Sequence, residues 1–219
     1  MTFRTWCDRI PKTVELCSVE LPGRGTRLQE PLFTRLTPLV EAIAPALLPY
    51  LDKPFAFFGH SMGAMICFEL TRLLRLEYNI SPVHLFVSGR RAPQIPDPKP
   101  PIHALPEALF IEELRRLNGT PEAVLENREL MELLLPILRA DFAIVETYTY
   151  INEPALECPI TAFGGLQDRE VDRENLEAWQ EQTRAAFALQ MFPGDHFFLN
   201  SGQTMLLESL TRSLDSIKL

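Results

Sequence analysis

A serine flanked by two glycines is the first feature of this 219-residue chain that could perform chemistry. Ser61 stands at the centre of a Gly-x-Ser-x-Gly pattern, with Gly59 and Gly63 on either side. The apolar run that begins at residue 55 is typical of a buried strand, and the apolar spacing that continues to residue 74 predicts a helix. A sharp turn between strand and helix exposes a serine hydroxyl, and small flanking residues let the two elements approach closely. The pattern therefore predicts a serine nucleophile.

A nucleophilic serine needs a base that takes its proton, and the chain offers four histidines. We predict that His196 is this base, because it directly follows the last predicted strand. Ser61 follows an earlier strand, and the carboxyl ends of parallel strands share one edge of a sheet. The other three histidines are less suitably placed. His60 should point away from the serine hydroxyl at a sharp turn, His84 lies within a predicted strand, and His103 lies in a proline-rich segment.

The base in turn needs a carboxylate that orients it. The loop after the preceding strand offers Asp168, with Glu170 and Asp172 behind it as alternatives. We favour Asp168, because it is closest to the strand end, where a side chain is held most rigidly. Asp195 is adjacent to His196 and should face elsewhere as a solvated loop residue. The resulting chain order, serine, aspartate and then histidine, is that of α/β-hydrolases and differs from the chymotrypsin and subtilisin orders.

The elements that must position these residues alternate between strands and helices. A short helix is expected within residues 3–10, and Pro45 and Pro49 should kink or shorten the helix in which they lie. Such alternation predicts a mostly parallel central sheet with helices on its faces. The expected strands are 13–21, 55–59, 83–88, 159–164 and 187–192, and the expected helices outside the next segment are 36–51, 64–74, 175–183 and 205–217.

The alternation stops at Arg90. Residues 92–106 contain six prolines and should form an extended, exposed linker. Only helical patterns follow, at 108–117 and at 127–150, with a bend or split expected at Pro136 and a helix start at Thr120 and Pro121. We interpret residues 92–153 as a helical lid inserted into one α/β domain that spans 1–219. The alternative is a second, small helical domain.

Composition excludes several classes of protein. The net charge is −8 and no basic stripe is present, which argues against nucleic-acid binding. The four cysteines are scattered without a C-x-x-C pair, so neither a zinc site nor a disulfide framework is expected. No apolar run is long enough to span a bilayer, and the N-terminus lacks the apolar stretch of a signal peptide. We therefore expect a cytoplasmic protein without membrane contact; its oligomeric state is left open.

With these residues in view, the chain resembles the type II thioesterases, the free-standing editing enzymes of nonribosomal peptide and polyketide synthesis. The resemblance extends to relatives in fatty acid synthesis. It implies an α/β-hydrolase fold whose helical lid shapes an acyl pocket and a channel for a phosphopantetheine arm. The family's triad falls on Ser61, Asp168 and His196. The matching segments are Phe3–Trp6, Leu21–Gly25, Phe58–Gly63, Ser88–Pro93, Gly164–Asp168 and Gly194–Leu199.

The resemblance also concerns the oxyanion hole, in which one donor would be the backbone N–H of Met62. In the family, the second donor comes from a glycine-rich turn that follows an additional strand ahead of Phe3. We expect this chain to lack that strand and turn. Loss of one oxyanion donor lowers turnover about a hundred- to a thousandfold. A chain with an intact triad should therefore be weakened and still active.

The function expected from these observations is hydrolysis of acyl thioesters on carrier-protein domains. No metal or organic cofactor is expected, because the phosphopantetheine arm belongs to the substrate. Alternatives are a medium-chain acyl thioesterase of fatty acid synthesis, a general carboxylesterase, or a catalytically impaired hydrolase fold that only binds carrier proteins. Docking of an acidic carrier protein would use basic side chains, for which the candidates are Arg24, Arg27, Arg90 and Arg91.

Overall fold

The computed structural model describes residues 3–215 of the chain. These residues divide into two compact units. The first unit holds residues 3–19, 43–95 and 152–215, and the second holds Glu20–Ala42 and Pro96–Ile151. The second unit thus includes a segment, Glu20–Ala42, that the sequence did not assign to the inserted helices.

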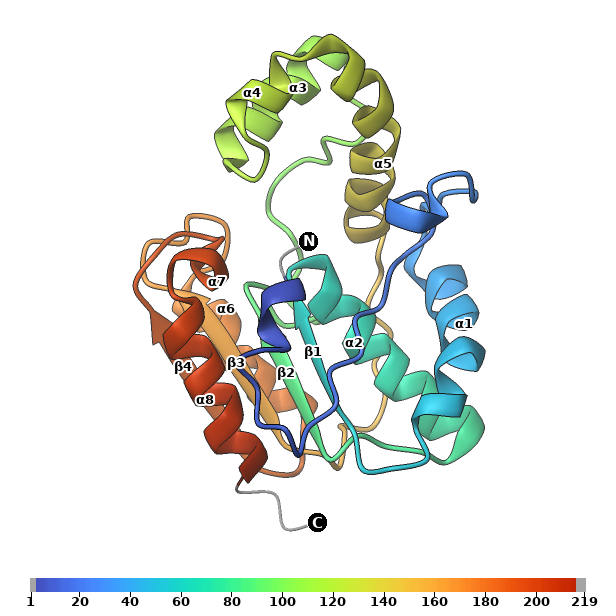
Figure 1. Cartoon of the computed structure of the whole chain (residues 1–219), viewed down its shortest axis with the longest axis vertical. Helices are drawn as coiled ribbons and strands as arrows, with labels where there is room; N and C mark the ends of the chain where they lie inside the picture. Colours follow the sequence, from blue (N-terminus) through green and yellow to red (C-terminus); the bar gives the residue numbers. More distant parts are fainter. Residues whose placement is uncertain (1–2, 216–219) are drawn as a thin grey trace. The chain divides into compact units, whose positions relative to one another are not determined.

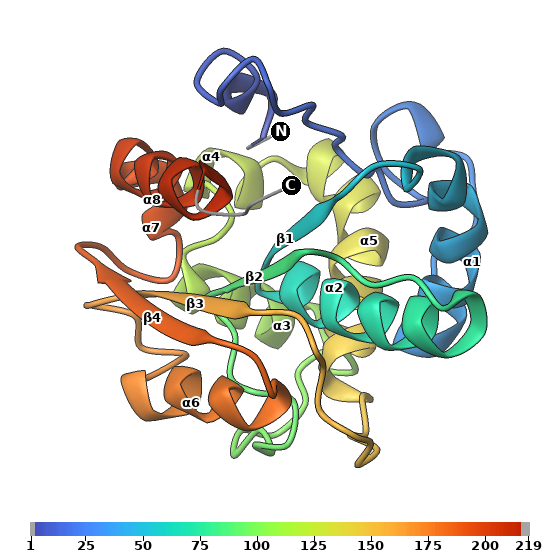
Figure 2. The same cartoon turned by 90° about the horizontal axis from the view of Figure 1, so that it is seen from below.

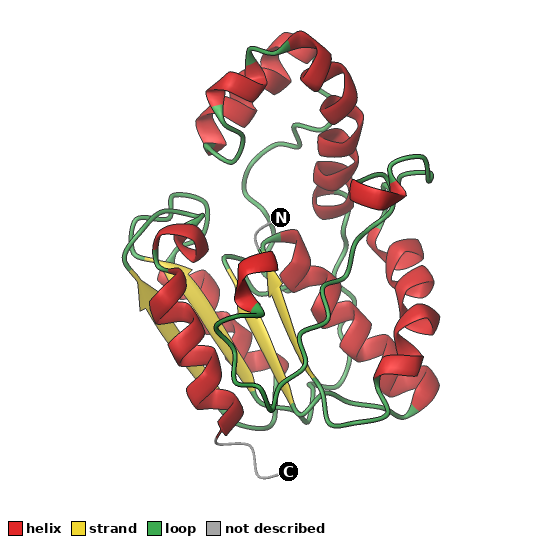
Figure 3. Ribbon diagram, viewed as in Figure 1, coloured by secondary structure: helices red, strands yellow, loops and turns green. Residues whose placement is uncertain are grey.

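A four-stranded parallel sheet forms the centre of the first unit (Figure 1; yellow in Figure 3). Its strands pair in chain order, and the register sets His60 beside Ser88 and Gly165 beside Phe192. The carboxyl ends of the strands therefore lie at one edge, as the sequence predicted. The strands are β1 (Ala56–His60), β2 (His84–Ser88), β3 (Ile160–Gly165) and β4 (Phe187–Phe192).

The strand predicted over residues 13–21 is wrong, because this segment is irregular in the structure. None of the described strands pairs with it, and Val14 donates its N–H to Pro11 in a turn at 2.9 Å. Leu16 packs against the main apolar cluster, whereas Val19 is 52% exposed. Its apolar residues thus reflect local packing without the backbone pairing that defines a strand.

Helices cover both faces of the sheet. The helices α2 and α6 lie on one face, and α8 lies on the opposite face (Figure 2). After its last residue, α2 widens into a π-helical turn at Leu74–Tyr78. The helices of this unit are α2 (Met62–Leu73), α6 (Arg173–Glu177), α7 (Phe198–Ser201) and α8 (Gln203–Asp215), with 3-10 turns at Arg4–Trp6 and Ala178–Gln182.

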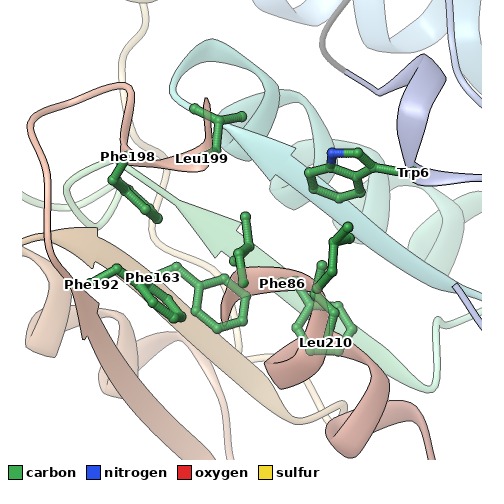
Figure 4. Packing of buried hydrophobic residues seen from close by; sticks show 9 residues of the cluster. Trp6, Phe86, Phe163, Phe192, Phe198, Leu199 and Leu210 are labelled. Atoms are coloured by element: carbon green, nitrogen blue, oxygen red, sulfur yellow. The ribbon is translucent and has the colours of Figure 1, made fainter. Parts of the chain in front are cut away.

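Aromatic residues of the sheet form the core beneath α8 (Figure 4). Phe86 of β2 and Phe163 of β3 stack with centroids 6.0 Å apart, and Trp6 is buried in the same cluster. The apolar face predicted for the last helix is confirmed, since Leu206, Leu207 and Leu210 lie in this cluster. Ile217, which completed that pattern, lies outside the described residues. Burial of such side chains contributes about 2 kcal/mol each.

The helix α1 spans Leu36–Leu47 and passes from one unit to the other. Pro45 lies inside it, and a 3-10 turn at Leu48–Tyr50 follows. The helix expected over residues 36–51 therefore ends early, as its prolines indicated. Proline removes a backbone donor and strains the preceding turn.

The second unit contains three further helices, α3 (Glu107–Leu117), α4 (Glu122–Leu125) and α5 (Arg128–Glu146). Of the bend or split expected at Pro136, the split is wrong, because α5 continues through this residue. Leu135 and Ile137 are buried on either side of this proline, so packing compensates for the lost backbone bond. The helix ends at Glu146, short of the predicted end at residue 150, and Thr147 is its C-cap. At the start of α4 the capping residue is Pro121, one position later than predicted.

Two polar contacts tie distant segments of the second unit together. Arg24 forms a two-bond ion pair with Asp141 of α5, at 2.7 and 3.0 Å. The carboxylate of Glu146, the last residue of α5, accepts the backbone N–H groups of Ile102 and His103 at 2.8 and 3.0 Å. The segment that enters this group of helices is thus bound to the segment that leaves it. A role as a lid stays a prediction.

The proline-rich linker agrees with expectation in part. Residues 96–101 are exposed and lack regular structure. Ala92, at its start, is fully buried, and its N–H donates to the Asn175 carbonyl at 3.0 Å. The expectation of an exposed segment is therefore wrong at this end. Among the described residues, no helix has the length and apolar character needed to cross a membrane.

Candidate active site

The turn that carries Ser61 joins β1 to α2 in a strained conformation. Ser61 has φ 53° and ψ −115°, and its N–H donates to the Ser88 carbonyl at 2.8 Å. Positive φ is uncommon for residues other than glycine and occurs often at functional sites. A Cβ on Gly59 would lie 2.1 Å from the carbonyl oxygen of Gly63, so strand and helix meet at Gly59 as predicted. A Cβ on Gly63 would meet no atom of the first unit within 4 Å, so the prediction that a small residue is required there is wrong.

The loops after β3 and β4 are joined to one another. Gln167 donates its N–H to the Gly194 carbonyl at 2.9 Å, and its side-chain oxygen accepts the Gly194 N–H at 2.6 Å. A Cβ on Gly165 would lie 2.3 Å from the Asp195 carbonyl oxygen, so this close approach requires glycine. The two loops carry Asp168 and His196, which are thereby brought together.

Asp168 and His196 form a hydrogen-bonded pair. The distance between Asp168 Oδ2 and His196 Nδ1 is 2.8 Å, and the two side chains are 1% and 16% exposed. The other carboxylate oxygen of Asp168 accepts the N–H groups of Glu170 and Val171 at 2.8 and 3.2 Å. Burial by itself raises the pKa of the Asp168 carboxyl, but the bond and charge of His196, with the two N–H groups, outweigh it and lower that pKa. The carboxylate is thus charged and fixed beside the imidazole.

The alternative carboxylates have local roles. Asp172 caps α6 by accepting the Asn175 N–H at 2.8 Å. Asp195 accepts the Phe197 N–H at 2.9 Å within its own loop. Of these carboxylates, the structure therefore brings to His196 the one that is closest to the strand end, Asp168.

His60 brings the serine turn next to the His196 loop. The centroids of the His60 and His196 rings are 5.0 Å apart, and Ser61 directly follows His60. The hydrogen bonds of the described residues include none from the Ser61 hydroxyl to His196. Hydrogen bonds of this type are often loose before substrate binds and tighten in the complex. The arrangement thus places a serine, an imidazole and a carboxylate at one edge of the sheet.

Sequence reasoning set His60 aside as the base because it should point away from the serine hydroxyl, and did not predict its packing against the His196 ring. His84 lies in a strand as predicted, at the start of β2: it is buried, stacks on Phe86 at 4.2 Å, and contacts the Thr161 hydroxyl at 2.9 Å. His103 contacts Glu146 within the second unit. The signal that could have identified His60 was its place at the carboxyl end of β1.

Met62 is the first residue of α2, so its N–H has no acceptor within the helix. The partial positive charge of a helix N-terminus favours an anion at this place. The role of this N–H in an oxyanion hole stays a prediction. Among the described residues, no group of three or more His, Cys, Asp or Glu side chains could hold a metal ion.

The arginines considered for docking are largely engaged within the protein. Arg91 is 6% exposed and donates to the Glu170 carbonyl at 3.0 Å, so it cannot be offered to a partner. Arg24 pairs with Asp141, and Arg27 pairs with Glu30 at 2.5 Å. Neither of these two is the freely solvated side chain that a docking patch would use.

The family model of the thioesterase domain matches residues 1–214, which is nearly the whole chain. The chain belongs to the thioesterase family. It is 51% identical to the gramicidin S biosynthesis protein GrsT of Aneurinibacillus migulanus, over 97% of this chain and 83% of that protein. It is 49% identical to the linear gramicidin dehydrogenase LgrE of Brevibacillus parabrevis, over 98% of this chain and 82% of that protein.

Solved thioesterase structures share this fold. The RedJ thioesterase of the prodiginine pathway in Streptomyces coelicolor superposes with a TM-score of 0.89 at 38% identity, over 96% of this chain and 80% of that one. The α/β-hydrolase fold class predicted from the sequence is therefore confirmed. A thioesterase hydrolyses thioesters, and the turn after β1 fits that chemistry. It carries Ser61 between two glycines, whereas a dinucleotide-binding turn carries three glycines.

Proposed function

We propose that this thioesterase removes acyl groups from the phosphopantetheine arms of carrier proteins, as an editing enzyme of nonribosomal peptide or polyketide synthesis. The observation that carries the proposal is the Asp168–His196 hydrogen bond of 2.8 Å beside the Ser61 turn, in a chain of the thioesterase family. The names of the relatives support the pathway, since they belong to the synthesis of gramicidin S, linear gramicidin and prodiginine.

In the first half of the reaction, His196 Nε2 takes the proton of Ser61 as the serine oxygen attacks the thioester carbonyl carbon. The carbonyl oxygen becomes an oxyanion, to which the Met62 N–H donates. The intermediate collapses, the carbon–sulfur bond breaks, and His196 gives its proton to the departing sulfur. The acyl group is then an ester of Ser61, and the thiol of the carrier arm is free.

In the second half, water replaces the thiol. His196 takes a proton from the water, whose oxygen attacks the acyl ester of Ser61. The carbon–oxygen bond to the serine breaks, the serine recovers a proton from His196, and the carboxylic acid leaves. Asp168 accepts the Nδ1–H bond throughout, which keeps Nε2 toward the serine and stabilises the imidazolium.

The acidity of the leaving group suits this site. A thiol has a pKa of about 8.5, so it leaves more readily than an alcohol and needs little help from the protonated base. The buried Asp168 carboxylate favours the positive charge that appears on His196 in each half-reaction. The chain's own side chains thus supply nucleophile, base and orienting acid.

The test is the Ser61→Ala variant, assayed with an acyl-carrier-protein thioester and labelled with a fluorophosphonate. We expect kcat to fall about a millionfold and labelling to disappear, because the nucleophile is lost. Ser81→Ala, on an exposed position before β2, is the matched control and should keep full activity. Undiminished hydrolysis by Ser61→Ala would refute the assignment. Faster turnover of p-nitrophenyl esters than of carrier thioesters would indicate a general carboxylesterase.

A further inference from the structure

The histidine before the serine is packed against the histidine that serves as base. The planes of the His60 and His196 rings meet at 52°, with centroids 5.0 Å apart. Phe197 and Phe198, from the same loop as His196, lie 6.1 and 5.9 Å from the His60 ring. Asp168 holds Nδ1 of His196, so the His196 ring is held by a carboxylate and by a neighbouring ring at once.

The end of β2 fixes the His60 ring. The hydroxyl of Ser88, which is fully buried, lies 3.0 Å from His60 Nδ1. Gly89 follows with φ 56°, and a Cβ at this glycine would lie 2.5 Å from His60 Cε1. The ring therefore occupies the space that a side chain at Gly89 would need. A ring bound at one nitrogen and packed against a backbone has few other rotamers.

The surroundings of His60 keep its ring uncharged. Its Nε2 is inaccessible to solvent and has no hydrogen-bond partner among the described residues. A protonated imidazole carries two N–H donors, and burial without acceptors is costly. Burial, followed by the charge of His196, lowers the pKa of His60 to about 3, although the charge of Asp168 acts in the opposite direction. His60 thus adds no positive charge beside His196 when that ring becomes protonated during turnover.

From this geometry we infer that His60 is a positioning residue for His196. The ring of His60, fixed by Ser88 and by the space at Gly89, holds the His196 imidazole between Asp168 and Ser61. The inference rests on the proposed function, because His60 acts only through the base. If the His60 ring is removed, His196 can rotate away from the serine oxygen while Asp168 still binds it. A misplacement of about 1 Å in a catalytic group costs about a hundredfold in rate.

The experiment compares variants that remove the ring, replace it or loosen it. For His60→Ala we expect kcat to fall about a hundredfold with the KM for an acyl-carrier thioester within about threefold. His60→Phe restores a ring beside His196 and should recover about tenfold of this loss. Ser88→Ala keeps His60 but removes the bond that fixes it, so kcat should fall about fivefold at unchanged KM. Circular dichroism and thermal melts verify that each variant is folded.

His84→Ala is the matched control, because His84 is also buried and bound to a hydroxyl, at the opposite end of the neighbouring strand. Its kcat should stay within about threefold of the parent. The inference is wrong if folded His60→Ala keeps its kcat, if only KM changes, or if His84→Ala loses as much activity. Should His60→Ala not fold, Ser88→Ala decides, and an unchanged kcat there overturns the inference.

The two proposals fail in different ways. If Ser61→Ala remains active, the proposed function is wrong whatever the His60 variants do. If Ser61→Ala is inactive and is not labelled by the fluorophosphonate, while His60→Ala keeps full activity, only the positioning role is wrong.

Discussion

The two edges of the parallel sheet differ in how the chain leaves the strands. At the carboxyl edge, Ser61, Gly89 and Gly194 follow β1, β2 and β4 with φ values of 53°, 56° and 124°. At the amino edge, the two residues directly before each described strand have no positive φ, and Asn79, with φ 54°, ends the π-helical turn five residues before β2. Strained backbone thus collects at the edge where the reactive side chains meet. This agrees with the general finding that strain is tolerated where function requires a fixed geometry.

Each edge carries a histidine, His60 at the carboxyl end of β1 and His84 at the amino end of β2. Burial lowers the pKa of both, to about 3 and about 4. A lowered pKa therefore does not by itself identify a functional residue. The residues around each ring distinguish the two histidines, since His84 packs on Phe86 in the core, whereas His60 packs on the His196 ring. Changes to the polar side chains at the carboxyl edge should affect turnover, and changes at the amino edge should affect stability.

After the loss expected for Ser61→Ala, the largest expected effect concerns Asp168 at the carboxyl edge. Asp168→Asn should lower kcat about ten-thousandfold, because an amide cannot hold His196 in the required tautomer or stabilise its charge. The matched control is Asp172→Asn, since asparagine also caps a helix well and α6 should be unaffected. Steady-state hydrolysis of an acyl-carrier thioester measures both. Equal losses in the two variants would contradict the distinction between them.

A smaller effect is expected from the glycines of the serine turn. Gly59→Ala should lower the free energy of unfolding by about 3 kcal/mol, because its Cβ would lie 2.1 Å from the Gly63 carbonyl oxygen. Gly63→Ala should be neutral or add about 0.5 kcal/mol, since alanine favours a helix and meets no atom of the first unit within 4 Å. Urea unfolding monitored by circular dichroism compares them. A tolerated Gly59→Ala would show that strand and helix can separate.

The effect expected at the amino edge is the smallest at pH 7 and grows as the pH is lowered. His84 is neutral in the folded protein, with a pKa of about 4, but takes up a proton below about pH 6.5 when the chain unfolds. The unfolded chain therefore binds more protons between these values, and stability falls as the pH is lowered from 6.5 toward 4. This costs up to about 3 kcal/mol at pH 4.

His84→Gln lacks this titration, so its stability deficit relative to the parent should shrink as the pH falls. Urea midpoints at pH 7 and pH 4.5 measure the change, and kcat at pH 7 should stay within about threefold. A deficit that is constant across this range would show that His84 does not titrate as its burial predicts.

Much of this arrangement followed from sequence patterns that have a direct physical cause. The four strands of the sheet are short apolar runs that must be buried, and their alternation with helices predicted a parallel sheet. Asp168 was preferred over Asp172 for its closeness to the strand end, and its bond to His196 at 2.8 Å agrees with that reasoning. Position along the strand thus carried more information than residue type.

Other features depend on neighbours that a sequence does not name. Residues 13–21 have the residue types of a strand, but a strand needs a partner for its backbone, and the described sheet provides none. The α5 helix continues through Pro136 because apolar contacts on both sides hold it. The packing of His60 against His196 was not predicted, because the contact arises from a loop 136 residues later in the chain.

The ion pair between Arg24 and Asp141 has a consequence for engineering. A chimaera that exchanges only Pro96–Ile151 with a relative would take the half-buried Arg24 and its partner at position 141 from different sequences, and a partner without a carboxylate would leave the guanidinium unpaired. The transferable module is discontinuous and includes Glu20–Ala42 as well. Exchange of both segments together keeps the pair within one donor sequence, so swaps of this unit should be designed with four junctions.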